Sequence, residues 1–457
     1  MILVKSLGIR YIWVDALCIL QDDMVDQLHT IPMMDVIYGN SVLTICAAAG
    51  SCSSHGLPGS PGSRRAAWQP TVACAGLELV ATRTVEGLIE NTVWNSRAWT
   101  FQERMLAKRS MIFVENRVFF QCRQATWSEE VCSEAPTSSW TLEMIRSPLK
   151  SFEKNPVRLY LECVELYSGR PLTVQGDRLP AFEGTSAILC PPLRASLFYG
   201  LPDSYFDLAL LWEKKVSGTR VEDFRGLYPY PSWSWSGWHG TSVWRLSMIS
   251  VARLNLHEWL ECHTWVAWYK LDPDKTTFLP VWSSGEVHPR PSRWHGYSKT
   301  TVDSEPFGRR PVSHVDDARS TVPTSGLRRS ECLYFWTWTA FFQISRQSRT
   351  SPSFASKLEP GLHRFGLLDA NARVGAVVEF VAVSDARDFS MEELDTWNYY
   401  VPEDREVSEW HLYYALLIVW DADHAVARRD GLAKICRRAF DLASFEPGKA
   451  WREVTLG

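Results

Sequence analysis

The most informative absences in this sequence are the common catalytic signatures. There is no GxGxxG dinucleotide fingerprint, no GxxxxGK[ST] phosphate loop and no GxSxG nucleophile elbow. The stretch GLPGSPG is rich in glycine, but its two prolines lack the backbone N–H donors that a phosphate cradle needs, so a plain turn is favoured. No bound cofactor and no metal are therefore expected from sequence motifs.

Long uncharged apolar runs are also absent. No window reaches about 18 such residues, so we expect no membrane span. Lys5, Arg10 and Asp15 interrupt the apolar N-terminus, which does not have the pattern of a signal peptide. The net charge of −4 and the pI near 6.3 give no basic footprint for nucleic acid. The 11 cysteines are scattered and form no CxxC pair, which predicts reduced thiols in a cytoplasmic protein and no zinc site.

What is present is the composition of a soluble globular chain. With 457 residues, 46% of them hydrophobic and 22% charged, the protein has room for two or three domains. The 22 tryptophans are expected to pack in cores and domain interfaces.

The first fifty residues alternate between strand-like and helix-like apolar patterns. Ile9–Val14 is rich in β-branched and aromatic residues and predicts a strand ending near Asp15. Met24–Tyr38 has helical spacing, with Pro32 marking a first turn or a kink, and Ser41–Ala49 is a second apolar strand. Strand, helix, strand at this spacing predicts a βαβ unit with parallel strands, hence an α/β domain.

Later segments predict further elements of mixed type. Asn95–Leu106 has the pattern of a helix, and PSWSWSGWHG from Pro231 alternates Trp with Ser like a half-buried strand. The remaining predicted strands are Leu77–Thr82, Ser110–Val114, Arg117–Cys122, Leu333–Ile344, Val374–Val383 and Leu412–Trp420. The Ser-, Pro- and Arg-rich residues 283–330 are the best candidate for a disordered insertion.

Two clusters of polar residues are candidate sites. Asp15 is expected at the carboxyl end of a parallel strand, where it either lines a ligand crevice or accepts hydrogen bonds from its own turn. Asp22 and Asp23 are better explained as caps of the following helix. In Arg97–Arg104, a cap and salt-bridge set that docks the helix is favoured, and Glu103 could point along the apolar face.

Three ordered blocks resemble the fungal heterokaryon incompatibility (HET) domain. They are LGIRYIWVDALCILQDD, MMDVIYGNSVLTICAAAGSCSSHGLPG and NSRAWTFQERMLAKRSMIFVENRVFFQC. The resemblance continues weakly through DRLPAFEGTSAI and PSWSWSG. The matching positions are Trp13, Asp15, Cys18, Gln21, Asp22, Asp23, Tyr38, Arg97, Trp99, Thr100, Phe101, Gln102 and Glu103.

The resemblance implies an intracellular fungal protein of non-self recognition and programmed cell death, acting through a protein partner or self-association. The family's domain is likened to Toll/interleukin-1 receptor (TIR)-like α/β domains, some of which cleave NAD. A TIR-like NAD glycohydrolase, with Asp15 and Glu103 as catalytic carboxylates and NAD as substrate, is the alternative. Family members usually begin with an earlier SYxWG-like strand block, which this sequence lacks, so an inactive truncated remnant is a further alternative.

These observations combine into one expected architecture. Residues 1–125 form a partial TIR- or flavodoxin-like parallel sheet with helices, followed by a mixed α+β extension. That extension divides into 126–282, the insertion 283–330 and a β-rich segment 331–457. Asp15 is expected at a crevice rim within reach of Arg97–Glu103, paired with Arg97 or beside Glu103; in the second case one carboxylate holds a proton near neutrality.

Overall fold

The chain forms two compact units, which we describe separately. The computed structural model describes residues 1–52, 54–60, 71–80, 85–122, 126–129, 156–216, 218–223, 226–245, 253–281, 323–348, 351–355, 375–390, 393, 408–442 and 444–457. Unit 1 comprises Met1–Leu159 with Arg170–Leu189, and unit 2 comprises Tyr160–Gly169 with Cys190–Gly457. Most of the predicted insertion 283–330, namely residues 283–322, lies outside the described residues.

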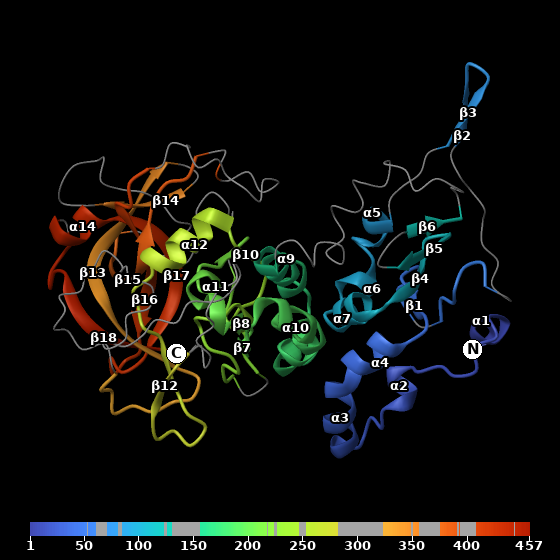
Figure 1. The fold of residues 1–457 in the computed structure, drawn as a ribbon, viewed down its shortest axis with the longest axis horizontal. Coiled ribbons are helices and arrows are strands. Elements are labelled where there is room, and N and C mark those ends of the chain that lie inside the picture. Colours follow the sequence, from blue (N-terminus) through green and yellow to red (C-terminus); the bar gives the residue numbers. More distant parts are fainter. Residues whose placement is uncertain are drawn as a thin grey trace, which may run out of the picture. The chain divides into compact units, whose positions relative to one another are not determined.

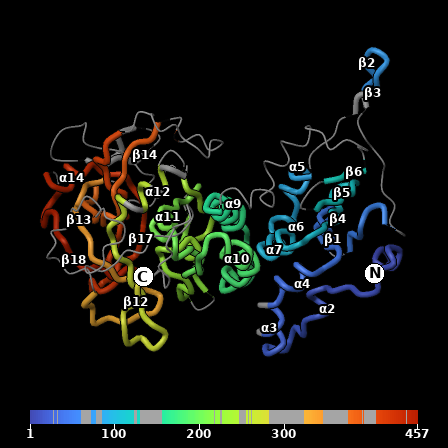
Figure 2. The backbone as a smooth tube through the Cα atoms, viewed as in Figure 1, coloured from blue at the N-terminus to red at the C-terminus, as the bar shows by residue number. Residues whose placement is uncertain are grey.

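Unit 1 begins with short helices, traced in blue in Figure 2. They are α1 (Ile2–Ser6), α2 (Asp15–Cys18), α3 (Met24–Thr30), the 3-10 turn η1 (Ile31–Met33) and α4 (Met34–Asn40). The predicted strand Ile9–Val14 is wrong, because residues 9–14 have no strand hydrogen bonding. Val14 has extended dihedrals, yet Tyr11 and Ile12 are exposed. An extended apolar segment becomes a strand only where another strand supplies its hydrogen bonds.

The predicted helix Met24–Tyr38 is confirmed, with an interruption at its proline. Pro32 lies in the first turn of η1, between α3 and α4, where its missing N–H costs least. Asp23 is the N-cap of α3, and its carboxylate accepts hydrogen bonds from the backbone N–H groups of Val25 and Asp26.

The sheet of unit 1 is mixed. Its strand order is β1 (Thr44–Ala47), β4 (Arg109–Val114), β5 (Arg117–Cys122) and β6 (Thr126–Ser128). β1 pairs in parallel with β4, whereas β4–β5 and β5–β6 are antiparallel. The parallel partner of β1 is therefore β4 and not residues 9–14, and the parallel sheet expected for residues 1–125 is present only as this one pair among the described strands of unit 1.

Helices cover this sheet and complete a small apolar core (Figure 1). The predicted helix Asn95–Leu106 is two helices, α6 (Val93–Ser96) and α7 (Trp99–Leu106), while α5 (Val85–Ile89) packs against β4. α7 packs against α4 and β1. The buried core residues are Cys46, Ala48, Val85, Leu88, Ile89, Ile112, Val114 and Phe119. A separate hairpin joins β2 (Thr71–Cys74) to β3 (Leu77–Val80).

Further short elements follow along the chain. They are α9 (Pro156–Ser168), η4 (Gln175–Arg178), α10 (Pro180–Leu193), β7 (Leu197–Phe198), β8 (Leu201–Pro202), η5 (Asp203–Tyr205), α11 (Phe206–Ala209), β9 (Glu213–Lys214), η6 (Trp235–Gly237), β10 (Ser242–Val243) and α12 (Arg253–Cys262).

The main sheet of unit 2 closes on itself. Its strands are β11 (Tyr269–Leu271), β12 (Phe278–Pro280), β13 (Leu333–Ser348), β14 (Ser351–Ala355), β15 (Val377–Ala386), β16 (Leu412–Trp420), β17 (Ala427–Cys436) and β18 (Ala450–Leu456), with α14 (Arg437–Leu442) before the last. The strands run β13–β15–β16–β17–β18, and β18 pairs with β13 again, which forms a closed barrel. The predicted strands in these regions are confirmed, and their neighbours are almost all antiparallel.

The predicted half-buried strand PSWSWSGWHG is wrong. This segment contains the 3-10 turn η6, and both Trp233 and Trp235 are fully buried, as are Ser234 and Ser236 between and after them. The indole N–H groups of the two tryptophans donate to the backbone carbonyls of Glu331 and Gly200. Both residue types are buried, so the alternation does not separate an inner face from an outer one.

The part of the chain that the structure describes contains no helix that is both long and apolar enough to cross a membrane.

Candidate functional site

Asp15, the residue that interrupts the first apolar run, begins α2. Its side chain is exposed, and its Oδ1 accepts a hydrogen bond of 2.8 Å from the N–H of Ala16. Within the same turn, the N–H of Val14 contacts the sulfur of Cys18, and the Gln21 amide donates to the carbonyl of Ile19 at 2.9 Å. Asp15 therefore lies at a helix start at the surface, not at the end of a strand.

Glu103 lies on α7 and is largely shielded from water. Burial, together with the nearby negative charge of Asp15, raises the pKa of its carboxyl to about 7, while the positive charge of Arg97 opposes the shift. The structure thus brings Asp15, Arg97 and Glu103 into electrostatic range of one another. The charges of both Asp15 and Arg97, the groups of the two expected arrangements, act on the Glu103 carboxyl.

Tyr38 of α4 belongs to the same cluster. Burial raises the pKa of its phenol well above the usual range, and the negative charges of Glu103 and Asp15 add to this effect. The Tyr38 ring meets the Trp13 ring edge-on, with 5.6 Å between centroids. This aromatic contact fixes the segment that precedes α2 against α4.

A break between α6 and α7 positions Arg97. The Thr100 hydroxyl lies 2.7 Å from the carbonyl oxygen of Trp94 and 2.9 Å from that of Arg97, so its single proton can go to either of these backbone acceptors, which are left open at the break. The Arg97 carbonyl also accepts from the guanidinium of Arg170 at 3.0 Å. Arg97 itself is exposed, and its positive charge acts on the carboxyl of Glu103.

The other predicted residues of this helix hold it against neighbouring segments of unit 1. Trp99 is half-buried and bonds to the carboxyl of Asp177, and Phe101 is buried and stacks on Phe182. The Gln102 amide oxygen accepts the N–H of Gly184 at 3.2 Å. Trp99 and Phe101 therefore help to dock α7, as expected, although the strand expected beside it is absent.

Asp22 and Asp23 differ in role. Asp23 caps α3, as predicted, whereas Asp22 is exposed beside it. The site thus gathers Asp15, Tyr38, Arg97 and Glu103, with Trp13, Cys18, Gln21, Trp99, Thr100, Phe101 and Gln102 as the frame around them.

Sequence reasoning missed one member of the cluster, Cys46, and placed another, Arg104, in a salt-bridge set. Cys46 of β1 is buried, and burial raises the pKa of its thiol to about 12. Arg104 forms an ion pair with Glu86 and also donates to Gln121 at 3.3 Å. A signal for Cys46 was its position two residues after Thr44, on the inner face of β1. The ion pair of Arg104 with Glu86 agrees with the expected salt-bridge set.

Chemically, the cluster offers one carboxyl that is protonated near neutral pH and a second carboxylate that is exposed to solvent. Such a pair can exchange a proton with a bound molecule. Among the described residues, no group of three or more His, Cys, Asp or Glu side chains has an arrangement that could hold a metal ion.

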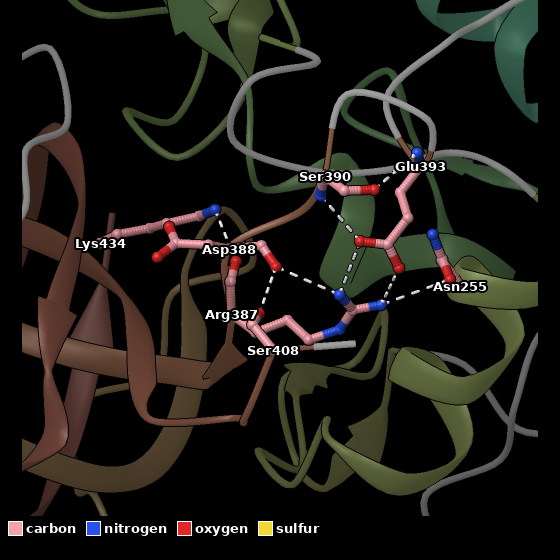
Figure 3. Close-up of polar contacts among 7 residues, drawn as sticks. All are labelled: Asn255, Arg387, Asp388, Ser390, Glu393, Ser408 and Lys434. Carbon is pink, nitrogen blue, oxygen red and sulfur yellow. Dashed lines mark hydrogen bonds and ion pairs between the residues drawn. The ribbon is translucent and has the colours of Figure 1, made fainter. Parts of the chain in front are cut away.

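A second cluster of charges lies in unit 2, and it is buried (Figure 3). The Arg387 guanidinium donates to both carboxylate oxygens of Glu393, at 3.0 and 2.8 Å, and to Asn255 at 3.4 Å. The ammonium of Lys434 donates to the Arg387 carbonyl at 2.8 Å, and the N–H of Ser390 donates to Glu393. Because the charges of Arg387 and Glu393 match each other inside the protein, this cluster holds the chain after β15 in place.

Unit 1 is therefore a mixed α/β domain with a paired-carboxylate cluster built from α2, α4 and α7. The model of the heterokaryon incompatibility protein (HET) family matches residues 1–103, which contain Asp15, Tyr38, Arg97 and Glu103. Residues 1–103, within unit 1, are thus similar to the HET family. No curated protein and no solved structure matches the chain.

Proposed function

We propose that this protein is a recognition module of heterokaryon incompatibility, which signals cell death by binding a protein partner through unit 1. The observation that supports this proposal is the exposure of apolar side chains at the start of the HET match. Tyr11 is 79% exposed, Leu17 69%, Met24 71% and Val25 75%, and Leu20 is exposed between them. We call these five residues the N-terminal apolar surface.

The density of this surface favours a binding role. About half of the large hydrophobic side chains that are exposed in the described part of the chain lie within residues 1–42. Single exposed hydrophobic residues are ordinary, but a concentration of them is typical of interaction sites, because burying them against a partner removes apolar area from water.

The test is a growth assay in a filamentous-fungal host that expresses the full chain. Expression of the unaltered protein should reduce viability, measured by colony growth and uptake of a vital dye. The double substitution Leu17→Asp with Met24→Asp should restore growth, because it places charge on the N-terminal apolar surface. Val174→Asp, at another exposed apolar position of unit 1, is the matched control and should remain toxic. Equal toxicity of all three proteins would contradict the proposal.

An enzymatic function is a second candidate, favoured by the pKa of Glu103. A carboxyl that titrates at about 7 beside the carboxylate of Asp15 is suited to acid–base catalysis near neutral pH. In this proposal the domain is a TIR-like NAD glycohydrolase, and Glu103 and Asp15 act on the substrate.

This alternative has a direct test with purified protein. The full chain should consume NAD. Glu103→Gln should abolish turnover, and this variant should still unfold cooperatively, which shows that it is folded. Glu90→Gln, at an exposed carboxyl of the same unit, should keep full activity. Absence of NAD turnover in the unaltered protein would reject the enzyme and favour the interaction module.

A further inference from the structure

A groove in unit 2 lies outside the HET match and is independent of the function proposed for unit 1. Its volume is about 740 Å³, within the usual range for sites of small organic ligands. One wall comes from the turn after α10, and the opposite wall from the β11–β12 hairpin, whose strands are antiparallel.

The net charge of the groove lining is positive, whereas that of the whole chain is negative. The lining holds two cationic side chains, Arg194 and Lys270, against one carboxylate, Asp203. The chain as a whole has a net charge of −4, so an anion is attracted here by a local excess of positive charge. The Asp203 carboxylate is already engaged, because its Oδ1 accepts the N–H of Ser196 at 2.9 Å.

The two cations differ in how firmly they are held. The Lys270 ammonium lies 5.0 Å from the centre of the Phe198 ring, which fixes the side chain beside the groove. Arg194 follows α10 with φ of 49°, a left-handed conformation that costs free energy for a residue with a side chain. Its side chain is exposed, which leaves the guanidinium available to a ligand.

Apart from Ser196, the rest of the lining is mostly apolar. Leu279, Pro280 and Val281 form the edge and floor beside Lys270, and Leu279 is 42% exposed. We propose that this groove binds a small organic anion, whose charged group lies between Arg194 and Lys270 and whose apolar part lies against Leu279 and its neighbours. A phosphate or a carboxylate would satisfy the two cations, and Arg194 favours either through its planar pair of donors.

The test is a titration of the full chain with phenyl phosphate and with benzoate, followed by saturation-transfer NMR. At least one anion should bind saturably with a Kd of about 1 mM or tighter, and benzyl alcohol, which is neutral, should not. Comparing the two anions distinguishes phosphate from carboxylate as the preferred head group. Absence of saturable binding by both anions would overturn the proposal.

Variants of the lining residues test whether the groove is the binding site of the anion. Lys270→Gln and Arg194→Gln should each weaken binding by about tenfold, because each removes a charged hydrogen-bond donor. Asp203→Asn should leave binding equal or tighter, since it removes the one negative charge of the lining and keeps an acceptor for Ser196. Lys275→Gln, an exposed lysine in the turn of the same hairpin, should have no effect. Equal affinity in all variants would place the binding elsewhere and overturn the assignment.

Discussion

At the scale of single residues, Glu103 is the group whose protonation is most informative about unit 1. Its folded-state pKa of about 7 lies above the ordinary value of 4.5. The folded state therefore binds the proton more tightly than the unfolded state, and the resulting stability is lost as the pH rises from about 4.5 through 7. Glu103→Gln removes this loss, so the variant should exceed the unaltered protein in stability by about 2–3 kcal/mol at pH 8.

The measurement is chemical denaturation at pH 5.5, 7 and 8.5. The advantage of Glu103→Gln should grow across this series, and Glu90→Gln should show no such trend. Burial also raises the pKa of Glu213 in unit 2 to about 7, so only the difference between variant and unaltered protein isolates Glu103. A constant difference at all three pH values would contradict the assignment.

The buried pair Arg387–Glu393 gives a second prediction at this scale. Glu393→Gln should destabilise unit 2 by about 3–5 kcal/mol, because it leaves a fully buried guanidinium without its counter-charge. The double variant Arg387→Met with Glu393→Leu should cost less than the single one, since it removes both charges. Thermal unfolding of the unaltered protein, the single variant and the double variant is the measurement. If the double variant were the least stable, the loss of stability would come from lost packing and not from an unpaired charge.

At the scale of elements, the start of α3 separates two adjacent aspartates. Asp23→Ala should cost about 1 kcal/mol, because the N–H groups of Val25 and Asp26 lose their acceptor. Asp22→Ala is the matched control one residue away and should change stability by less than about 0.5 kcal/mol. Urea denaturation of both variants is the measurement, and equal losses would contradict the capping role.

The elements also show which parts of the fold were predictable. Three features depend on local chemistry, and each was predicted. Asp23 is a capping residue, the segment from α3 to α4 has helical spacing, and β1 has a run of β-branched residues. The strand at Ile9–Val14 was not formed, because strand formation needs a partner edge, and that is a property of the whole sheet and not of the segment. The pairing of β1 with β4, some sixty residues away, has no local signal for the same reason.

The candidate site was predicted in part. Glu103 follows Trp99 by four residues, so its place on the inner face of α7 could be expected from helical geometry. Asp15 was expected at the end of a strand and lies instead at the start of a helix, although it remains near Glu103. In unit 2, the alternation of Trp with Ser gave a wrong prediction of a half-buried strand. The serines did not have to face water, because the hydroxyls of Ser234 and Ser236 form hydrogen bonds inside the protein.

At the scale of the whole molecule, the barrel of unit 2 depends on its last strand. β18 pairs with β13 from Leu456 opposite Leu333 to Ala450 opposite Thr339, and it also meets β17 at Ala427. Val454 and Leu456 are fully buried. Without β18 the edges of β13 and β17 would be open, and open edges of a barrel expose both backbone hydrogen-bonding groups and the core.

Removal of residues 450–457 should therefore abolish the cooperative unfolding of unit 2, detected as loss of the near-ultraviolet circular dichroism of its buried tryptophans. Leu456→Ala is a milder variant that should still fold and should lose about 2–5 kcal/mol. The matched control replaces the hairpin 71–80 by a Gly-Ser linker of equal length. Because β2 and β3 pair only with each other among the described strands, this change should leave the tryptophan signal of unit 2 intact. If the truncated chain kept a cooperative transition, closure by β18 would not be what stabilises the barrel.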